Sequence, residues 1–314
     1  MLKNMDNKVV VLGCNTSQIP YIEEINKQGY KIIGVDKNIE APGKSLCHTF
    51  YNFGYDDIEQ LIKMTQYENL NSTGKVFTAG AQFAYIGLSK VCEEAKINFP
   101  TTKTIEMCLD KKKFYEEFEK NGIRIPETQY VTSSSELQLA IKNMSNRVTH
   151  YYLKSDHSKN PNYIYQLTND ANVEKMEINW KKDRYFRQFY ILQEEFFGTH
   201  VRLNIYGNNG NVYLFDGSNI RIPGQQVINQ VKESGVIFTL HQFLIKHNLS
   251  RFLVKFDIVI NSVGEYVVLD IGLDPPFRMM HHFTDQGNNF FENYIDQYLN
   301  NQITYPILEN CICF

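Results

Sequence analysis

Two aspartates, Asp257 and Asp270, are the residues whose type and placement most directly suggest chemistry in this chain. Both lie in the segment Leu253–Asp274, where two alternating, β-branched runs flank the loop Asn261–Gly264, a pattern that predicts a β-hairpin. Side chains alternate between the two faces of a strand, so both carboxylates fall on one face of that hairpin. Carboxylate oxygens are ligands that Mg²⁺ prefers. The placement therefore predicts a divalent-metal site, and the alternative is a solvated sheet face with an ordinary salt bridge.

The register of the predicted hairpin follows from its loop. If Ile260 lies opposite Glu265, then Lys255 lies opposite Asp270. The polar face then carries Lys255, Asp257, Val259, Tyr266, Val268 and Asp270. The apolar face carries Phe256, Ile258, Ile260, Val267, Leu269 and Ile271. A shift by one residue in the loop would change the partners across the hairpin but not the alternation within each strand.

The size and charge of the chain set the limits for the elements that position these residues. With 314 residues and 43% hydrophobic content, the chain can form two or three domains with cores of their own. The net charge is −3 with both signs mixed and no basic stripe, so nucleic acid is not an expected partner. No apolar run approaches the roughly 20 residues of a membrane span, and the N-terminus lacks the layout of a secretion signal.

The cysteines indicate a reducing compartment. The six of them form no CxxC pair and no disulfide-dense pattern, which predicts free thiols and a cytoplasmic protein. The last four residues, Cys311-Ile312-Cys313-Phe314, formally fit a prenylation box. Because no polybasic segment precedes this box, an unmodified C-terminus is the expectation.

The first hundred residues alternate between strand-like and helix-like segments. The strand Lys8–Gly13, the amphipathic segment Ile19–Lys27 and the strand Lys31–Asp36 begin this series, which predicts an α/β domain with a parallel sheet and crossover helices. Such a Rossmann-like start invites a dinucleotide site. The loop after the first strand, however, has one glycine, Gly13, where the dinucleotide fingerprint needs three, so NAD or FAD binding is not expected.

The rest of the chain mixes helices with shorter strands. The charged segment Leu109–Asn121 predicts a helix whose Phe114 and Phe118 face inward. Tyr151–Lys154 is a short aromatic strand that ends on a lysine, and Gln226–His247 is predicted to be one long helix.

This order of features resembles the ATP-grasp superfamily, specifically its branch of carbamoyl-phosphate synthetase and biotin carboxylase. The resemblance covers nearly the whole chain. It implies a Rossmann-like α/β domain preceding the ATP-grasp fold over residues 1–100. The two-part, α+β ATP-grasp fold then follows, with an N-terminal lid subdomain over 101–192 and a C-terminal metal-binding subdomain over 193–314.

The resemblance assigns two phosphate-binding lysines. Lys111, in the pair Asp110-Lys111 that opens the charged helix, is similar to the family's first lysine, with Lys112 or Lys113 as the alternative if the register is shifted. Lys154, at the end of its strand, is similar to the second. A lysine is a compact cation, which suits the closely spaced charges of ATP.

The resemblance also implies where the nucleoside would bind. The run from Gln193 to Phe197 contains Glu194, Glu195 and Phe196 and resembles the hinge that recognises adenine, mainly through backbone groups. His200 falls where the family places a Glu or His on the ribose.

The remaining assignments concern the metal and the reacting groups. By resemblance, Asp257 and Asp270 hold Mg²⁺. Three further residues are catalytic candidates on their own chemistry: Lys255 neutralises phosphate or only balances the acids, Asp274 adds a metal ligand or binds a substrate amine, and Arg278 holds a substrate carboxylate. Arg278 follows a Pro-Pro turn and has a guanidinium suited to a carboxylate or an acyl-phosphate. For two further arginines, Arg202 and Arg221, the sequence leaves two alternatives: the same role or a position on the surface.

Two departures from the family pattern stand out. The expected lid, residues 155–162, has no glycine, although the family's lid is usually glycine-rich so that backbone amides cover the phosphates. Gly272 occupies the position, two residues after the second acid, where the family usually has Asn. One side-chain ligand is therefore absent.

The resemblance implies an enzyme that uses ATP and Mg²⁺ to join a small-molecule carboxylate to an amine or related nucleophile through an acyl-phosphate. Homodimers, which are common in the family, are a possible state. Two alternatives stay open: a catalytically silent, nucleotide-binding relative with a regulatory role, and a small-molecule kinase whose acceptor is a hydroxyl.

Overall fold

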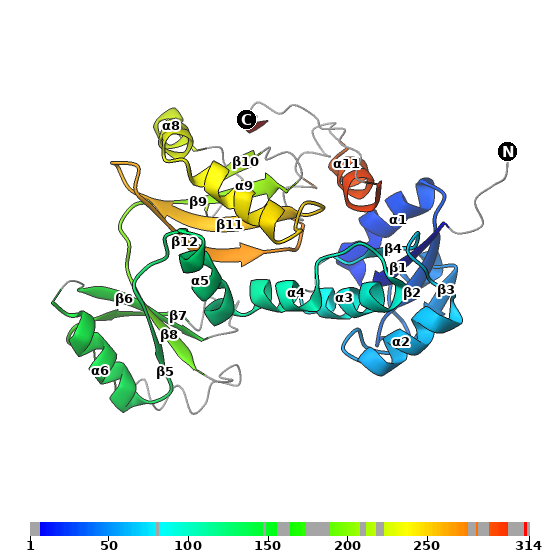
Figure 1. Ribbon diagram of the computed structural model, residues 1–314, viewed down its shortest axis with the longest axis horizontal. Helices are drawn as coiled ribbons and strands as arrows, with labels where there is room; N and C mark the ends of the chain where they lie inside the picture. The colour runs from blue at the N-terminus through cyan, green and yellow to red at the C-terminus, as the bar shows by residue number, and fades with distance from the viewer. Residues whose placement is uncertain are drawn as a thin grey trace.

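The computed structural model describes residues 7–79, 82–146, 149–155, 164–171, 173, 189–207, 212–217, 223–275, 281, 289–300 and 311–312. These residues form three sheets, which we call the N-terminal, middle and C-terminal sheets (Figure 1). The first is parallel and the other two are antiparallel. The predicted α/β class with α+β parts is therefore confirmed.

The N-terminal sheet has the strand order β3-β2-β1-β4. Its central strand β1 reads Lys-Val-Val-Val-Leu and is buried on both faces, as a strand covered by crossover helices must be. The four strands are β1 (Lys8–Leu12), β2 (Lys31–Val35), β3 (Thr49–Tyr51) and β4 (Lys75–Phe77). The helices are α1 (Ile19–Lys27), α2 (Ile58–Tyr67) and α3 (Ala84–Ala95).

The chain returns to this domain near its C-terminus. Helix α11 (Phe290–Ile295) packs on α1, and the rings of Tyr21 and Phe291 meet edge to face at 4.9 Å. A π-helical turn, Asp296–Asn300, continues the helix, and Tyr30 is hydrogen bonded to Asn300. The last helix therefore packs on the first domain (Figure 1), and its first residue, Phe290, also meets Tyr213 of the C-terminal sheet at 5.4 Å.

The middle sheet has the order β5-β8-β6-β7 and a core of its own. Helix α6 (Ser134–Met144) supplies Leu137 and Met144 to this core. Its strands are β5 (Thr128–Val131), β6 (His150–Ser155), β7 (Ile164–Thr168) and β8 (Tyr190–Glu194).

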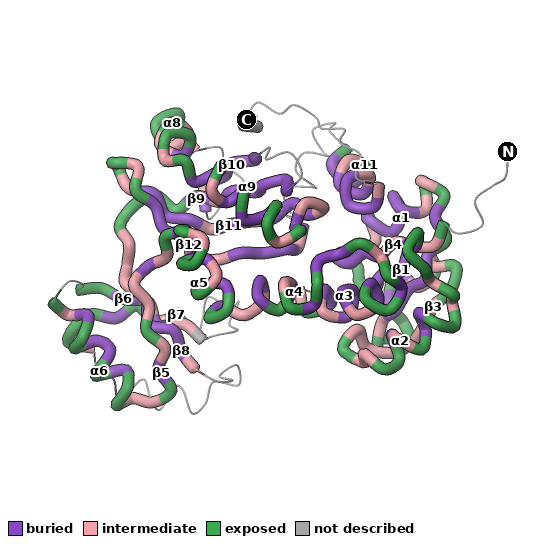
Figure 2. The backbone as a smooth tube through the Cα atoms, viewed as in Figure 1, coloured by how far each residue is buried: buried purple, intermediate pink, exposed green. Residues whose placement is uncertain are grey.

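The C-terminal sheet has the order β12-β11-β9-β10-β13, and its strands β9 to β12 are largely buried (Figure 2). They are β9 (Thr199–Tyr206), β10 (Val212–Asp216), β11 (Leu253–Ile260), β12 (Tyr266–Gly272) and β13 (Cys311–Ile312). The predicted long helix is wrong: α8 (Gln225–Glu233) and α9 (Val236–Lys246) are separate helices, because Gly235 takes a left-handed φ of +71° between them.

The hairpin of β11 and β12 forms, but its predicted register is wrong. Its loop is one residue longer, so Ile260 pairs with Tyr266 rather than Glu265. A β-bulge at Leu269 then adds a second offset, and Asp257 pairs directly with Asp270. The loop shift turns Tyr266 and Val268 into the core, and Val267 and Leu269 away from it. The bulge returns Asp270 to the face of Asp257.

Helices α4 (Thr102–Leu109) and α5 (Lys111–Lys120) connect the first domain to the rest of the chain. Phe114 and Phe118 of α5 are buried as predicted, and Phe118 packs on Phe243 and Phe256.

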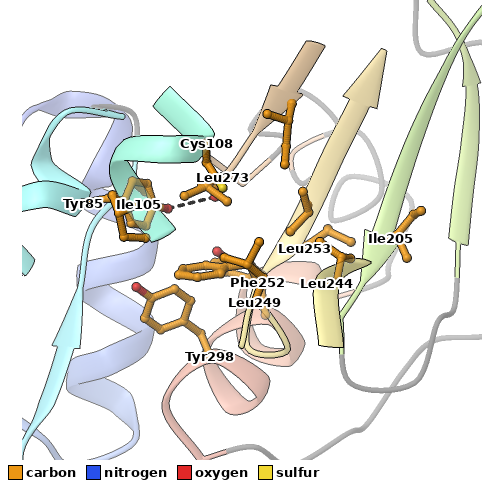
Figure 3. Close-up of a cluster of buried hydrophobic side chains, with 14 of the residues drawn as sticks. Tyr85, Ile105, Cys108, Ile205, Leu244, Leu249, Phe252, Leu253, Leu273 and Tyr298 are labelled. Atoms are coloured by element: carbon orange, nitrogen blue, oxygen red, sulfur yellow. Dashed lines mark hydrogen bonds between the residues drawn. The ribbon is translucent and has the colours of Figure 1, made fainter. Parts of the chain in front are cut away.

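A buried aromatic cluster joins the N-terminal domain to the C-terminal sheet (Figure 3). Phe252, just before β11, contacts Tyr85 of α3 and Tyr298 of the last helical turn. The Tyr85 hydroxyl donates a hydrogen bond of 2.9 Å to the carbonyl of Leu273 (Figure 3). This contact fixes the end of β12. The predicted metal ligand Asp270 lies two residues before that end.

Candidate active site

The two predicted acids face each other across β11 and β12. Asp257 and Asp270 are direct partners in the register, so their side chains project from the same face of the C-terminal sheet. The Asp257 side chain is 14% exposed and that of Asp270 is 40% exposed. Asp270 is therefore the more open of the two carboxylates.

Asp257 is held by the neighbouring strand β9. Arg202 donates from Nε to Oδ1 at 2.8 Å and from Nη2 to Oδ2 at 3.3 Å, the two-pronged geometry of a guanidinium on a carboxylate. His200 Nε2 lies 3.5 Å from the same Oδ1. Burial opposes ionisation of Asp257, but hydrogen bonds from His200 and Arg202 hold its pKa at about 2. Arg202 thus lies in the site.

Asp270 is paired with Lys111, the first residue of α5. Their Nζ and Oδ1 atoms are 2.9 Å apart, and Lys111 is 8% exposed. Although the surrounding protein disfavours charge, Lys111 and Lys154 lower the pKa of Asp270. The two alternative lysines lie elsewhere, since Lys112 sits over the ring of Tyr130 and Lys113 pairs with Glu106. The Asp110 side chain caps α5 by accepting from the Lys113 amide.

Lys154, near the end of β6, approaches the two acids from the middle sheet. Its ammonium donates to the hydroxyl of Tyr115 at 3.0 Å. Burial lowers the pKa of Lys154 to about 8, against the opposing attraction of Asp270 and Asp257.

Tyr115 was not predicted, yet it links three elements at the site. It is fully buried on α5, and its hydroxyl donates to the carbonyl of the bulge residue Leu269 at 2.7 Å. The same hydroxyl accepts from Lys154 on the middle sheet. The sequence does contain a signal, because Tyr115 lies four residues after Lys111 and so on the same face of the helix.

A cavity of about 440 Å³ opens beside these groups, between the middle and C-terminal sheets. Its volume lies within the range of small-ligand pockets. Apolar walls come from both sides of the cavity, and Lys154 and His200 supply cationic or polar groups. The lining residues are Tyr152, Lys154, Ile164, Gln193, Glu194, Glu195, Phe196, Phe197, Gly198, His200, Val259 and Leu269.

The predicted hinge forms one wall of this cavity. The Glu194 carboxylate accepts from the Glu127 amide at 3.0 Å, and the Glu195 carboxylate accepts from the Tyr152 hydroxyl at 3.0 Å. Both acids therefore hold the hinge in place. For Phe196 and Phe197, no hydrogen bond from the backbone amide is found within the described part of the chain.

His200 lines the cavity because Gly217 leaves room for its ring. A Cβ at Gly217 would lie 2.3 Å from His200 Cγ and Nδ1, and the Gly217 amide donates to the His200 carbonyl at 2.9 Å. Gly217 was not predicted as part of the site.

Lys255 extends along the same face toward Gly272. It pairs with Gly272 in the register and not with Asp270, which corrects the prediction. The Lys255 side chain lies over Gly272, the position where the resemblance led us to expect an asparagine.

The other predicted catalytic residues lie away from the acids or outside the described structure. Asp274 is half-buried just beyond β12, where its charge raises the pKa of Tyr21, after the larger effect of burial. It stands on the side of the N-terminal domain. Arg221, Arg278 and the lid residues 156–162 lie outside the described residues.

The donor set at Asp257 and Asp270 fits one Mg²⁺ ion bound together with phosphate. Among the residues that the structure describes, no three acidic, histidine or cysteine side chains form a complete metal cage. Mg²⁺ commonly takes one or two carboxylates and completes its octahedron with phosphate oxygens and water. Four cationic side chains, Lys111, Lys154, Lys255 and Arg202, surround the two acids, so the site carries net positive charge that suits a polyphosphate.

Comparisons with known proteins give the fold. No family model matches the chain, and no curated protein matches its sequence. Solved structures do match. N5-carboxyaminoimidazole ribonucleotide synthetase from Thermotoga maritima superposes with a TM-score of 0.70 and 16% identity, over 95% of this chain and 77% of that one.

Two further solved structures show the same similarity in fold. The biotin carboxylase domain of the Hydrogenobacter thermophilus 2-oxoglutarate carboxylase, a dimer in complex with MgADP, ADP and bicarbonate, gives a TM-score of 0.70 at 16% identity over 96% of this chain and 72% of that one. L-amino acid ligase from Bacillus licheniformis gives 0.67 at 11% identity, over 94% and 75%. The fold is that of the ATP-grasp superfamily, as the resemblance implied. Within the described ranges, the helices are too short or too polar to cross a bilayer.

Proposed function

We propose that this protein is an ATP- and Mg²⁺-dependent ligase that joins a carboxylate to an amine or a related nucleophile. The observation that carries the proposal is the meeting of Lys111, Lys154, Asp257 and Asp270, from three separate segments, beside a cavity of nucleotide size. The ATP-grasp fold supports it, and so do structural neighbours named as synthetase, carboxylase and ligase.

In this proposal the cavity binds the nucleoside. The amides of Phe196 and Phe197 face the adenine edge, Val259 and Leu269 pack on its flat face, and His200 contacts the ribose. Apolar walls with a few placed polar groups are the usual lining of such pockets. Glu194 and Glu195 act indirectly, by holding the hinge strand.

The phosphates extend from the cavity toward the two acids. Lys154 and Lys111 bind phosphate oxygens, and Asp270 and Asp257 hold Mg²⁺. When bound, the ion supplies positive charge that offsets the charge developing on the phosphates during transfer. Arg202 keeps the Asp257 carboxylate ionised and oriented.

The reaction proceeds in two displacements. A carboxylate oxygen of the first substrate attacks the terminal phosphorus, the bond to the bridging oxygen breaks, and ADP leaves. The nitrogen of the second substrate then attacks the carbonyl carbon of the acyl-phosphate, inorganic phosphate leaves, and the nitrogen loses a proton to solvent or a basic group. Water must be excluded while the acyl-phosphate exists.

Incubation of the protein with Mg·ATP and pooled carboxylic acids and amines tests the proposal. A ligase releases ADP and phosphate only when both substrate classes are present. Addition of hydroxylamine in place of the amine should trap the acyl-phosphate as a hydroxamate. Substrate-dependent ADP release without hydroxamate would instead indicate a kinase with a hydroxyl acceptor. Tight nucleotide binding without turnover in any pool would indicate the silent relative.

We further propose the division into residues 1–100, 101–192 and 193–314, a cytoplasmic location and a homodimeric state. The free thiols of Cys14, Cys47, Cys92 and Cys108 support the location, and the dimer of the Hydrogenobacter thermophilus domain supports the assembly. The separate core of the middle sheet supports treating it as a subdomain of its own.

A further inference from the structure

The exposed face of the β11–β12 hairpin has three successive levels. Val259 and Leu269 line the nucleoside cavity at the first level. Asp257 and Asp270 form the second. Lys255 and Gly272 pair at the third. Residues two apart on a strand are separated by about 7 Å, so Lys255 lies one step beyond the acids, on the side away from the nucleoside cavity.

The ammonium of Lys255 lies directly over Gly272. A Cβ built on Gly272 would be 2.9 Å from Lys255 Cε and 3.2 Å from Nζ. Gln82, from the N-terminal domain, reaches the same spot, with Nε2 3.3 Å from that position. Because Gly272 has no left-handed φ, its backbone does not require glycine. The lack of a side chain at Gly272 is therefore what gives the lysine its place.

Among the residues that the structure describes, Lys255 has no anionic partner of its own at this place. Within the described segments, no carboxylate oxygen lies within 4.0 Å of its Nζ, whereas Lys111 and Arg202 are each paired with one of the two acids. Its charge acts on Asp257 only at longer range. An ammonium that has no carboxylate partner among the described residues is suited to an anion that arrives with the ligand.

We propose that Lys255 binds the terminal phosphoryl group of the nucleoside triphosphate, and that Gly272 is required to place it there. This inference rests on the proposed function, since it takes the nucleotide to run from the cavity past the two acids. Lys111 and Lys154 lie at or before the level of the acids and contact the phosphates that ATP and ADP share. Lys255 distinguishes the third phosphate.

Calorimetric titration with Mg·ADP and with the magnesium complex of a non-hydrolysable β,γ-imido analogue of ATP tests this inference. For Lys255→Met we expect about tenfold weaker binding of the triphosphate analogue and ADP affinity within about twofold of the parent. Gly272→Ala retains the lysine but displaces its ammonium, and we expect the same selective loss. Lys63→Met, an exposed lysine on α2 paired with Glu59, is the control and should bind both ligands like the parent.

The outcomes separate this inference from the proposed function. Equal changes toward both ligands, or no change toward either, in variants with the parent's melting temperature overturn the role of Lys255 and leave the proposed function standing. Normal binding by Gly272→Ala overturns the role of the glycine. Failure of the parent protein to bind either nucleotide overturns the proposed function itself.

Discussion

The Asp257 carboxylate has two duties in the proposed site, because it would contact Mg²⁺ while accepting two hydrogen bonds from Arg202. Substitution Asp257→Asn keeps the shape but removes the charge and replaces one of the two acceptor oxygens by a donor. We expect about tenfold or greater loss of Mg²⁺-dependent nucleotide affinity, together with a lower melting temperature because Arg202 loses its ionic partner. Titrations with Mg²⁺ and with EDTA measure the effect. Equal Mg·ATP affinity in variant and parent would remove Asp257 from the metal site.

Lys154 should make nucleotide binding depend on pH. Its pKa of about 8 in the free protein means that it is mostly charged at pH 7 and loses its proton as the pH rises through 8. Phosphate prefers the charged ammonium, so nucleotide affinity should fall as the pH rises from 7.5 to 9.5. Over the last pH unit of this range, which lies above the pKa of Lys154, the affinity should fall about tenfold. Titration at several pH values measures this slope.

Lys154→Met is the matching variant at this position. It should bind ATP more weakly at pH 7 and lose most of the pH dependence above 8, because the titrating group is gone. A variant whose affinity and slope both equal those of the parent would exclude Lys154 from the phosphate site.

Individual residues of the proposed site could be predicted where residue type and order along the chain are enough to indicate their chemistry. Asp257, Asp270, Lys111 and Lys154 are of this kind, and the structure places them together. Tyr115 and Gly217 were missed because their roles exist only in tertiary contacts: one bridges two sheets, and the other makes room for a ring.

At the scale of elements, the β-bulge determines how the hairpin presents its acids. A regular hairpin with the observed loop would have placed Asp270 on the core face, and the extra residue Leu269 returns it to the cleft. Alternation along each strand was predictable, but a bulge has no reliable sequence signature. The same holds for the break between α8 and α9, where Ser234-Gly235 lies inside an otherwise helical pattern.

The bulge is fixed by α5 through Tyr115, whose hydroxyl donates to the Leu269 carbonyl and accepts from Lys154. Tyr115→Phe leaves the ring in place and removes both bonds, together with the 3.3 Å bond that the hydroxyl donates to Gln193. We expect a loss of about 1–3 kcal/mol in the free energy of unfolding, because the part-buried Leu269 carbonyl loses its partner. Urea denaturation measures it. Tyr67→Phe, on an exposed tyrosine, is the control, and equal stability of the two variants would contradict the bridging role.

At the scale of the whole molecule, the cleft depends on how the N-terminal domain is joined to the C-terminal sheet. The parallel sheet of the first domain was predicted from the alternation of strands and helices, but the return of α11 to α1 was not, since nothing local in residues 290–300 specifies a distant partner. Its consequence is the aromatic cluster around Phe252, which unites the first domain, the last helical turn and the start of β11 (Figure 3). Gln82 and Lys255 can meet only if this junction is intact.

Phe252→Ala tests the junction. The ring is fully buried and meets those of Tyr85, Phe99 and Tyr298 at 5.5, 5.8 and 5.6 Å. Truncation of the ring should lower the free energy of unfolding by about 3–5 kcal/mol. It should also weaken the coupling between the N-terminal domain and the C-terminal sheet, so that one unfolding transition separates into two. The matched control is Phe238→Ala on α9, where the ring is 65% exposed and little change is expected. Calorimetry distinguishes the two, and a Phe252→Ala protein that unfolds like the Phe238→Ala protein would mean that the junction does not hold the molecule together.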